Sequence, residues 1–403
     1  MRRLRLCIVM PRPEGHGGVP RTVINLANGL VEEHDVEIIG LLRWRNQPVF
    51  PIDPRVQVRY VQDLRPYGPK GGRRDITRGG VDEHGRPVTR ESVLAQQKPS
   101  AYVPFDHIHW ESNDQPLIEA LRTVGAELIV GTTPALNGLI VEHVPAAVAT
   151  VGQDHSIFQV RTRTPEQRAW LRRAIDGLDA FVSLTGADAR DYRAMMPGSD
   201  TLITAIPNAV SWPVAPVPAP LERPVVVAAG RLDAHKGFDR LIDAYAPIAE
   251  KRPDWRLDIY GSGSLRSQLQ AQIDRLGIGG RVALQGFTRE LPSVLAQSSV
   301  YALTSHSEGF PMVLLEAMST GLPLVSYDCP RGPADLVRDG VNGRLVPDGE
   351  QQALTDALLQ VIDDEPLRRS MGKRAWLDAH AYELPVITQR WNDVFEQVLA
   401  GRR

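Results

Sequence analysis

Residues 225–245, VVVAAGRLDAHKGFDRLIDAY, decide the fold. A short β-branched run ends in Gly230, and Gly237 leads into a pattern whose apolar residues recur at helical spacing. A buried strand that turns through a glycine-containing loop into a helix is the repeating unit of a parallel α/β sheet. The stretch therefore predicts a sheet whose loops, at the carboxyl ends of the strands, are placed to bind a ligand.

The same alternation of apolar runs and helical patterns fills the rest of the chain. Short strand-like runs lie at residues 6–10, 35–42, 126–132, 146–152 and 179–185, and again at 256–263, 282–287, 299–305, 322–328 and 343–347. Such alternation indicates βαβ units and parallel sheets covered by helices on both faces. The sequence predicts an α/β fold with two Rossmann-like domains in tandem, which face each other across a ligand-binding cleft.

A proline-rich stretch marks the predicted domain boundary. Residues 206–224, IPNAVSWPVAPVPAPLERP, hold six prolines, a composition typical of an extended, semi-rigid linker. We place the boundary near residue 213, which gives an N-terminal domain over 1–212 and a C-terminal domain over 213–385. Residues 386–403 predict a further amphipathic helix.

The composition bounds the class of protein. The 403 residues exceed what one hydrophobic core usually serves, and a net charge of -2 gives no global basic field for nucleic acid. Cys7 and Cys329 are far apart in apolar settings, which favours a reduced protein over a disulfide framework. The apolar run before Pro11 is too short for a signal peptide or a membrane span, so we expect a cytoplasmic location.

One segment interrupts the alternation. Residues 62–110 are rich in Gly, Arg and Pro. Structureless loops of this length are usually functional or disordered, so the segment either recognises a substrate or is a mobile excursion. His107 and His109 near its end are candidates for contacts with an acceptor or within the loop.

Two cations follow the strand at 225–230. Arg231 and Lys236 lie five residues apart. At the carboxyl end of a strand they can converge on a pyrophosphate, with the arginine as a two-pronged donor and the lysine as a point charge. The alternative is a surface ion pair with Asp233 or Asp239.

A second candidate anion site lies in residues 305–323, SHSEGFPMVLLEAMSTGLP. Pro311 suits the first position of a helix, and Gly321 suits its end. The amides of Met312 and Val313 would then be unpaired donors at the positive end of this helix.

Glu308 and Glu316 flank this second anion site. A carboxylate is a poor ligand for phosphate but a good acceptor for hydroxyl groups. The pair therefore indicates a ligand that carries phosphate and sugar together. The alternative is that one glutamate caps the helix and the other belongs to a buried ion pair.

Further candidates lie in the N-terminal half. Gly17 and Gly18, within PRPEGHGGVPR, allow the backbone to approach an anion closely at a helix N-terminus. Their spacing is not that of a dinucleotide fingerprint, and a turn needed for packing is the alternative. His155 follows the run at 146–152 within VATVGQDHSIF and is either structural or catalytic, with Asp154 beside it as a less specific candidate.

In combination these motifs resemble the retaining, GT4-type glycosyltransferases of the GT-B fold. The resemblance rests on GRLDAHKG, on the spacing of Glu308 and Glu316, and on GHGGVPR near the start. It covers essentially the whole C-terminal domain, including YGSGSLR (260–266), LQGFTRELP (284–292) and PADLVRDGVNGRLVP (333–347). It implies two facing Rossmann-like domains and a last helix that crosses back to the N-terminal domain.

The resemblance also implies roles for individual residues. Arg231 and Lys236 would bind the donor diphosphate. Glu316 would bind the nucleotide ribose, and His155 and Glu308 would be the catalytic residues close to the donor sugar. Further donor contacts would come from Gly17, Gly18, Gly261, Gly263, Phe287, Thr288, Gly309, Phe310, Pro311, Met312 and Val313. Acceptor contacts would come from His107, His109 and Asp154.

The implied reaction is transfer of a hexosyl group, with retention, from a nucleotide diphosphate sugar to a hydroxyl group. The family makes a UDP-sugar the expected donor, and a saccharide, a cell-wall or lipid-linked glycan, or a natural product the expected acceptor. No metal or other cofactor is required by this scheme, and the sequence shows no Asp-x-Asp motif. The chain departs from the family's usual Asn-Gly at Asn208 and Ala209.

Two other classes of function remain open on this fold. A nucleotide-sugar epimerase uses the same architecture without an acceptor, and a non-catalytic protein would only bind the nucleotide sugar. No nucleic-acid partner is expected. A peripheral contact of the last helix with the inner face of the membrane is the alternative to its packing role. The sequence leaves the donor sugar, the acceptor and the oligomeric state open.

Overall fold

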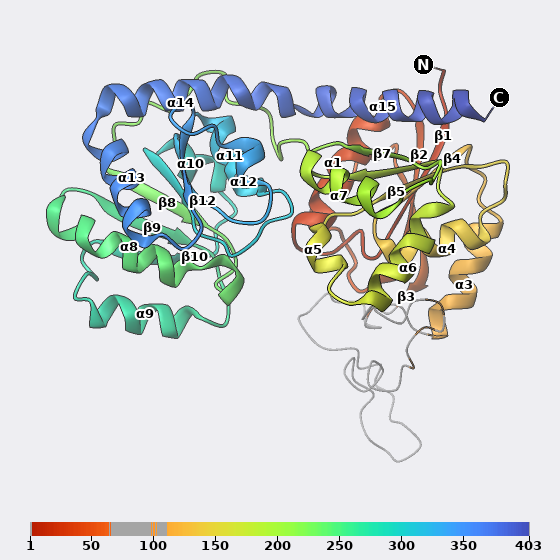
Figure 1. The fold of residues 1–403 in the computed structure, drawn as a ribbon, viewed down its shortest axis with the longest axis horizontal. Coiled ribbons are helices and arrows are strands. Elements are labelled where there is room, and N and C mark those ends of the chain that lie inside the picture. Colours follow the sequence, from red (N-terminus) through yellow and green to blue (C-terminus); the bar gives the residue numbers. More distant parts are fainter. Residues whose placement is uncertain are drawn as a thin grey trace, which may run out of the picture. The chain divides into compact units, whose positions relative to one another are not determined.

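Two parallel β-sheets organise the chain in a computed structural model that describes residues 2–63, 65, 98, 100, 102 and 111–402. The chain divides into two compact units, Met1–Ile206 with Thr388–Arg403, and Pro207–Ile387. Neighbouring strands in both sheets are parallel, and helices lie on both faces of each sheet (Figure 1). The predicted α/β fold with two Rossmann-like domains is therefore confirmed.

The first unit contains a seven-stranded sheet in the order β3-β2-β1-β4-β5-β6-β7. Its described elements are β1 (Arg5–Met10), α1 (Gly18–Leu30), β2 (Asp35–Arg43), β3 (Gln57–Asp63), α3 (Glu111–Arg122), β4 (Leu128–Gly131), α4 (Pro134–His143), β5 (Ala149–Gln153), α5 (Phe158–Arg161), α6 (Pro165–Asp176), β6 (Ala180–Ser183), α7 (Gly186–Met195) and β7 (Leu202–Ala205). Threonine side chains cap α4, α6 and α7 by accepting a backbone N–H of the first turn. These caps fix where each helix leaves the carboxyl edge of the sheet.

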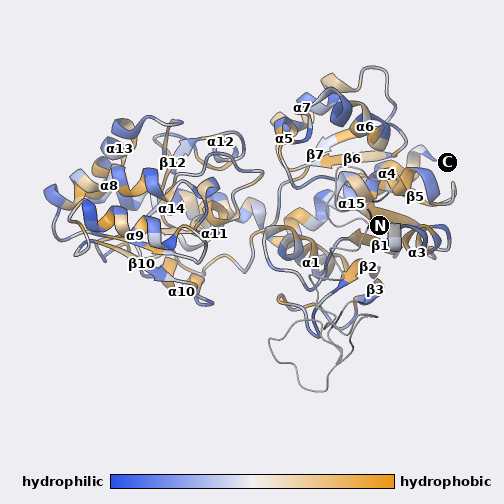
Figure 2. Cartoon of the chain, turned by 90° about the horizontal axis from the view of Figure 1, so that it is seen from below, coloured by the Kyte–Doolittle hydropathy of each residue, from blue (hydrophilic) through white to orange (hydrophobic). Residues whose placement is uncertain are grey.

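The second unit contains a six-stranded sheet in the order β10-β9-β8-β11-β12-β13. Its elements are β8 (Val225–Ala229), η1 (Ala234–Lys236), α8 (Phe238–Lys251), β9 (Arg256–Tyr260), α9 (Arg266–Arg275), β10 (Val282–Gly286), α10 (Leu291–Ala296), β11 (Val300–Leu303), α11 (Met312–Thr320), β12 (Leu324–Asp328), α12 (Pro333–Leu336), β13 (Gly343–Pro347), α13 (Gln351–Asp363), α14 (Glu365–Ala379) and η2 (His380–Tyr382). Helices α8, α9 and α13 carry hydrophilic residues on their outer sides (Figure 2). Every residue of the central strand β8 is buried, as a strand covered on both faces requires.

The proline-rich stretch packs against the second unit. The Ala215 N–H donates to the Ser319 carbonyl at 2.9 Å, and the Ala219 N–H donates to the Thr320 carbonyl at 2.8 Å. The indole of Trp376, on α14, donates to the Ala215 carbonyl at 2.7 Å. The stretch is thus fixed on α11 and α14. The two compact units divide before this stretch, between Ile206 and Pro207.

The last helix, α15 (Leu384–Gly401), belongs to the first unit from Thr388 onward. The amide of Asn392 lies 3.0 Å from the buried His34 ring and donates to Glu33 at 3.1 Å. Arg402 reaches Asp179 at 2.8 Å. These contacts hold α15 against segments that follow α1 and precede β6.

Replacing Trp391 by alanine is expected to destabilise the first unit by about 3–5 kcal/mol, because a buried indole would leave a cavity. The Trp391 side chain is buried, and its ring packs 5.8 Å from that of Phe395. Urea unfolding of Trp391→Ala and of Gln397→Ala, an exposed position on the same helix, measures this cost. Equal stability of the two variants would contradict the packing role of α15.

Candidate active site

The loop that follows β8 carries both predicted cations. Arg231 is directly after Gly230, its side chain is 78% exposed, and its Nη2 lies 2.9 Å from the Asp233 carboxylate. This is the surface ion pair that the sequence left open as an alternative. Because exposed pairs contribute little to stability, Arg231 can exchange Asp233 for a ligand anion at small cost. Lys236 ends η1, and Gly237, with a φ of 58°, precedes α8.

Lys236 and Glu308 form an ion pair on the carboxyl side of the second sheet. The Lys236 ammonium lies 2.6 Å from Glu308 Oε1, and the Ser305 hydroxyl donates to the same oxygen at 2.6 Å. Both charged side chains are mostly buried. The alternative of an ion-pair member is thus what the structure shows for Glu308. A ligand phosphate that reaches Lys236 has to compete with this carboxylate or share the ammonium with it.

The second predicted anion site lies at the N-terminus of helix α11. It begins at Met312, one residue later than predicted, because Pro311 has a ψ of 87° and stands outside the helix. No described residue accepts a hydrogen bond from the Met312 or Val313 amide. Gly321, with a φ of 83°, ends the helix as predicted. The two amides are therefore donors at the positive end of α11.

Glu316 faces the proline-rich stretch from inside α11. Its side chain is 1% exposed, and its Oε1 accepts a hydrogen bond from the Ser211 hydroxyl at 2.7 Å. A buried carboxylate that already accepts from one hydroxyl is chemically suited to a second hydroxyl donor. Burial raises the pKa of Tyr301 on β11, and the negative charges of Glu316 and Glu308 add to this effect. Both carboxylates therefore lie close enough to the Tyr301 hydroxyl to raise its pKa.

Two glycines allow the loop after β9 to approach the loop after β8. A side chain at Gly261, whose φ is 147°, would place its Cβ 1.7 Å from the Gly230 carbonyl oxygen. A Cβ at Gly263 would lie 2.3 Å from the Leu232 carbonyl oxygen. Both positions need glycine, because the backbone segments that flank Arg231 are in direct contact with them. Phe287, predicted to contact the nucleobase, is 72% exposed after β10.

The remaining donor candidates are Gly309 and Phe310 before α11 and Thr288 after β10. Gly309 and Phe310 precede α11, and the Phe310 ring is buried 5.9 Å from that of Tyr382. The Thr288 hydroxyl accepts from the Glu290 N–H at 2.9 Å, which shapes the turn after Phe287.

In the first unit, the glycine pair opens α1. Gly17 has a φ of 111° and precedes the helix, and Gly18 is its first residue. A Cβ at either position would meet no atom within 4 Å. Gly17 is thus required for its backbone conformation and not by crowding, and the loop surface remains open to a ligand.

His155 follows β5, directly after Asp154, whose carboxylate is fixed by four hydrogen bonds. Asp154 is buried and accepts two hydrogen bonds from Arg161 at 2.8 Å, one from the Tyr192 hydroxyl at 3.2 Å and one from the Ser156 N–H at 3.0 Å. Both Asp154 oxygens are occupied, so its position favours a supporting role over the predicted acceptor contact. His155 Nε2 is buried and has no hydrogen-bond partner among the described residues.

Burial lowers the pKa of His155 to about 4, with the Asp154 carboxylate opposing the shift and the Arg161 cation reinforcing it. The imidazole is therefore neutral near pH 7. Because the unfolded chain binds this proton at an ordinary histidine pKa of about 6.5, the stability that the shift reflects is present above pH 6.5. It is lost, by about 3 kcal/mol, as the pH falls towards 4.

We expect the NMR signal of the His155 ring not to titrate between pH 8 and 5.5. Spectra of 13C-histidine-labelled protein, assigned with a His155→Gln variant, measure this directly. Titration of the assigned signal near pH 6.5 would contradict the lowered pKa of His155. The variant should also lose stability less steeply than the wild type between pH 6.5 and 4.

The structure adds contacts that the sequence did not predict. Ser305 supports Glu308 from three residues away, a spacing visible in the sequence. Ser211 supports Glu316 across 105 residues, and no local pattern indicates this. His107 and His109 lie outside the described residues.

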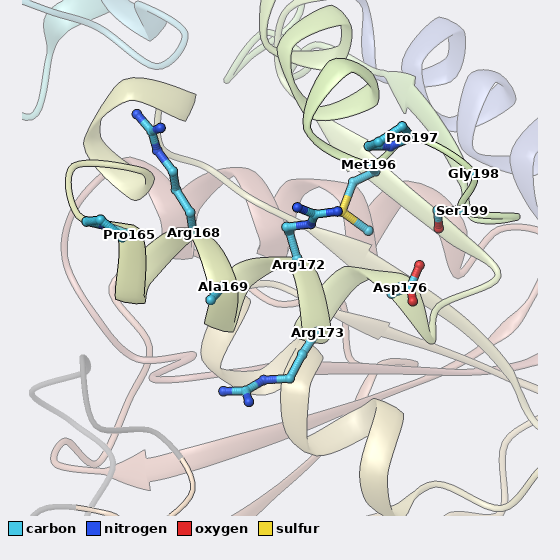
Figure 3. A pocket seen from close by; sticks show the side chains of 10 residues that line it. All are labelled: Pro165, Arg168, Ala169, Arg172, Arg173, Asp176, Met196, Pro197, Gly198 and Ser199. Carbon is cyan, nitrogen blue, oxygen red and sulfur yellow. The ribbon is translucent and has the colours of Figure 1, made fainter.

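A surface hollow of about 690 Å³ contains none of the predicted site residues. It is lined by α6, with Arg168, Arg172 and Arg173, and by residues 196–199. Figure 3 shows Arg172 reaching towards Met196, whereas Arg168 and Arg173 point away from it in different directions. The three guanidinium groups do not converge on one ligand position.

None of the helices within the described residues has the length and apolar content that a bilayer crossing requires. Across the same parts of the chain, no three His, Cys, Asp or Glu side chains gather where they could hold a metal ion. The predicted location and the predicted metal independence stay predictions.

Known proteins show the same fold and sequence features. A crystal structure of an S. aureus TarM mutant in complex with Fondaparinux, alpha-GlcNAc-glycerol and UDP matches 97% of this chain and 99% of that one, with a TM-score of 0.75 and 16% identity. An exopolysaccharide phosphotransferase of Streptomyces coelicolor is 32% identical over 96% of this chain, which spans 40% of that relative's length. An uncharacterised glycosyltransferase of Haemophilus influenzae is 26% identical over 94% of this chain and 96% of its own length.

These comparisons confirm the resemblance at the level of fold and domain family. The two parallel-sheet units define a GT-B fold. Residues 215–378 match the family model of glycosyl transferases group 1. This segment contains Arg231, Lys236, Glu308 and Glu316, so the part of the site that these four residues form lies within the matched segment.

Proposed function

We propose that the chain is a retaining glycosyltransferase that moves a hexosyl group from a UDP-sugar to a hydroxyl group of a saccharide acceptor. The observation that carries the proposal is the Lys236–Glu308 pair, with its atoms 2.6 Å apart, in a group 1 domain. It places a cation for phosphate and an acceptor for sugar hydroxyls side by side. UDP is bound by the TarM structure, which supports the same nucleotide here.

The proposed roles follow from charge and geometry. When the bond between sugar and diphosphate breaks, negative charge develops on the leaving diphosphate. Arg231, Lys236 and the α11 amides are fixed donors that stabilise this charge. Glu316 accepts from the ribose hydroxyls, and Glu308 accepts from hydroxyls of the donor sugar. Neutral His155 is proposed to act near the sugar, as a hydrogen-bonding group and not as a cation.

The phosphotransferase of Streptomyces coelicolor suggests a second candidate, transfer of a sugar phosphate. Because this chain spans 40% of that relative, the name alone does not assign the activity to the matched part. The two reactions release different nucleotides. Glycosyl transfer breaks the sugar–oxygen bond and releases UDP, whereas sugar-phosphate transfer breaks the pyrophosphate and releases UMP.

The test is incubation of the purified chain with UDP-glucose, UDP-N-acetylglucosamine, UDP-galactose and GDP-mannose, first without an acceptor. Liquid chromatography with mass spectrometry identifies the nucleotide and the sugar. Slow release of UDP and free sugar supports the proposal, and added saccharides should accelerate it. UMP would indicate the phosphotransferase, a changed sugar the epimerase, and binding without any product the non-catalytic protein. Full activity in EDTA is expected from the proposed absence of a metal.

A further inference from the structure

Arg240, on the first turns of α8, makes an unusually complete set of contacts. Its Nη1 donates to the Asp348 carboxylate at 2.8 Å, and its Nη2 donates to the Ser305 carbonyl at 2.8 Å. Its Nε donates to the Thr304 carbonyl at 3.2 Å, and Nη2 also bonds that oxygen. The guanidinium lies 4.5 Å from the centre of the Tyr327 ring. The side chain is 17% exposed, so these contacts hold it in one place.

The carbonyls that Arg240 binds belong to the segment that carries Glu308. Thr304 and Ser305 directly follow β11, and both are buried. The Ser305 carbonyl is bound by Arg240, while its hydroxyl donates to Glu308 at 2.6 Å. One residue thus connects the guanidinium to the carboxylate.

The same contacts join this segment to the loop of Lys236. The Thr304 hydroxyl donates to the Gly237 carbonyl at 2.8 Å, and the His306 N–H donates to the His235 carbonyl at 2.9 Å. A Cβ at Gly237 would lie 2.2 Å from the Thr304 carbonyl oxygen, so the two backbones touch. Arg240 therefore binds the Thr304–Ser305 segment at the place where this segment contacts the loop of Lys236. Lys236 and Glu308 lie close to this contact, one on each side of it.

The chemistry of this place favours arginine over lysine. Two carbonyls and a carboxylate are bound at once, and the ring of Tyr327 lies beside the guanidinium. A planar guanidinium offers five N–H donors in fixed directions and stacks on aromatic rings, whereas an ammonium offers three donors at one point. A lysine would keep the charge but lose part of the geometry.

We propose that Arg240 is a positioning residue, which aligns Glu308 and Lys236 with each other and with the donor. The inference rests on the proposed function of those two residues. Arg240 itself contacts neither the Lys236 nor the Glu308 side chain, so it acts through the Thr304–Ser305 segment.

The first test compares Arg240→Met with Arg252→Met. Arg252 directly follows the same helix, and its side chain donates two hydrogen bonds to Asp363, at 2.5 and 2.7 Å, away from the predicted site residues. With UDP-glucose or UDP-N-acetylglucosamine, whichever is turned over, kcat of Arg240→Met is expected to fall roughly 100-fold, as displaced catalytic groups require. The Kd of UDP should stay within about threefold, and Arg252→Met should keep kcat. Arg240→Lys should recover part of the loss.

The second test separates positioning from a merely structural role. If Arg240 acts through Glu308 and Lys236, the Arg240→Met/Glu308→Gln double variant should be about as slow as Glu308→Gln alone. Losses that multiply, to roughly 10,000-fold, would overturn the inference about Arg240 while leaving the proposed function intact. Full turnover by Glu308→Gln would instead contradict the proposed role of Glu308, and with it the inference. If Arg240→Met does not fold, Asp348→Asn, which weakens one contact, takes its place in both comparisons.

Discussion

A Glu308→Gln variant is expected to release UDP from its donor at least about 100-fold more slowly than the wild type. Glutamine preserves the size of the side chain but removes the negative charge that accepts from Lys236 and Ser305 at 2.6 Å. The proposed contact with the donor sugar is weakened in the same step. Because the Lys236 ammonium is then no longer shared with a carboxylate, UDP should bind as tightly as before or more tightly.

Isothermal titration with UDP and a UDP-release assay measure the two effects on one preparation. Glu222→Gln, an exposed position in the same unit, is the matched control and should change neither.

Arg231→Ala should show the opposite pattern, with UDP affinity reduced about tenfold, because a charge-assisted bond to the diphosphate is lost. If Glu308→Gln abolished UDP binding and Arg231→Ala affected only turnover, the proposed roles would be assigned to the wrong residues.

The strand-like runs of the sequence do not include β3 and β7, which shows how far periodicity predicts this fold. β3 and β7 form the two edges of the first sheet. All residues of β3 are exposed or half-buried, and β7 is four residues long. An edge strand has a neighbour on one side, so it does not need the continuous apolar run that reveals a central strand such as β8. All central strands were therefore predictable, whereas of the four edge strands β10 and β13 were predicted and β3 and β7 were not.

The same distinction between local and distant information applies to the candidate site. Lys236, Glu308 and the α11 N-terminus are recognisable because glycine, proline and charge follow one another in the sequence. Their partners are not, since Lys236 and Glu308 lie 72 residues apart and Ser211 and Glu316 lie 105 apart. The prolines before β8 also allow two interpretations, an extended linker or a segment packed on the second unit. Hydrogen bonds such as those to Ser319 and Thr320 distinguish a packed segment from a free linker, and the sequence does not reveal them.

A Gly261→Ala variant is expected to lose about 4 kcal/mol or more of stability in the second unit, together with most of its affinity for UDP. The added Cβ would lie 1.7 Å from the Gly230 carbonyl oxygen, a distance that no packing adjustment of side chains can relieve. The φ of 147° adds strain for any residue with a Cβ. Because Gly230 directly precedes Arg231, the backbone shift that relieves the clash moves this cation away from its position.

Gly277→Ala separates steric overlap from backbone strain. Gly277 also has a positive φ, of 69°, but a Cβ there would meet no atom within 4 Å. Only the conformational cost remains, about 1–2 kcal/mol, and UDP binding should be retained. Calorimetric unfolding measures the stability of both variants, and titration with UDP measures their affinity for the nucleotide. If Gly261→Ala were no more damaging than Gly277→Ala, the close approach of the β8 and β9 loops would not be what positions Arg231.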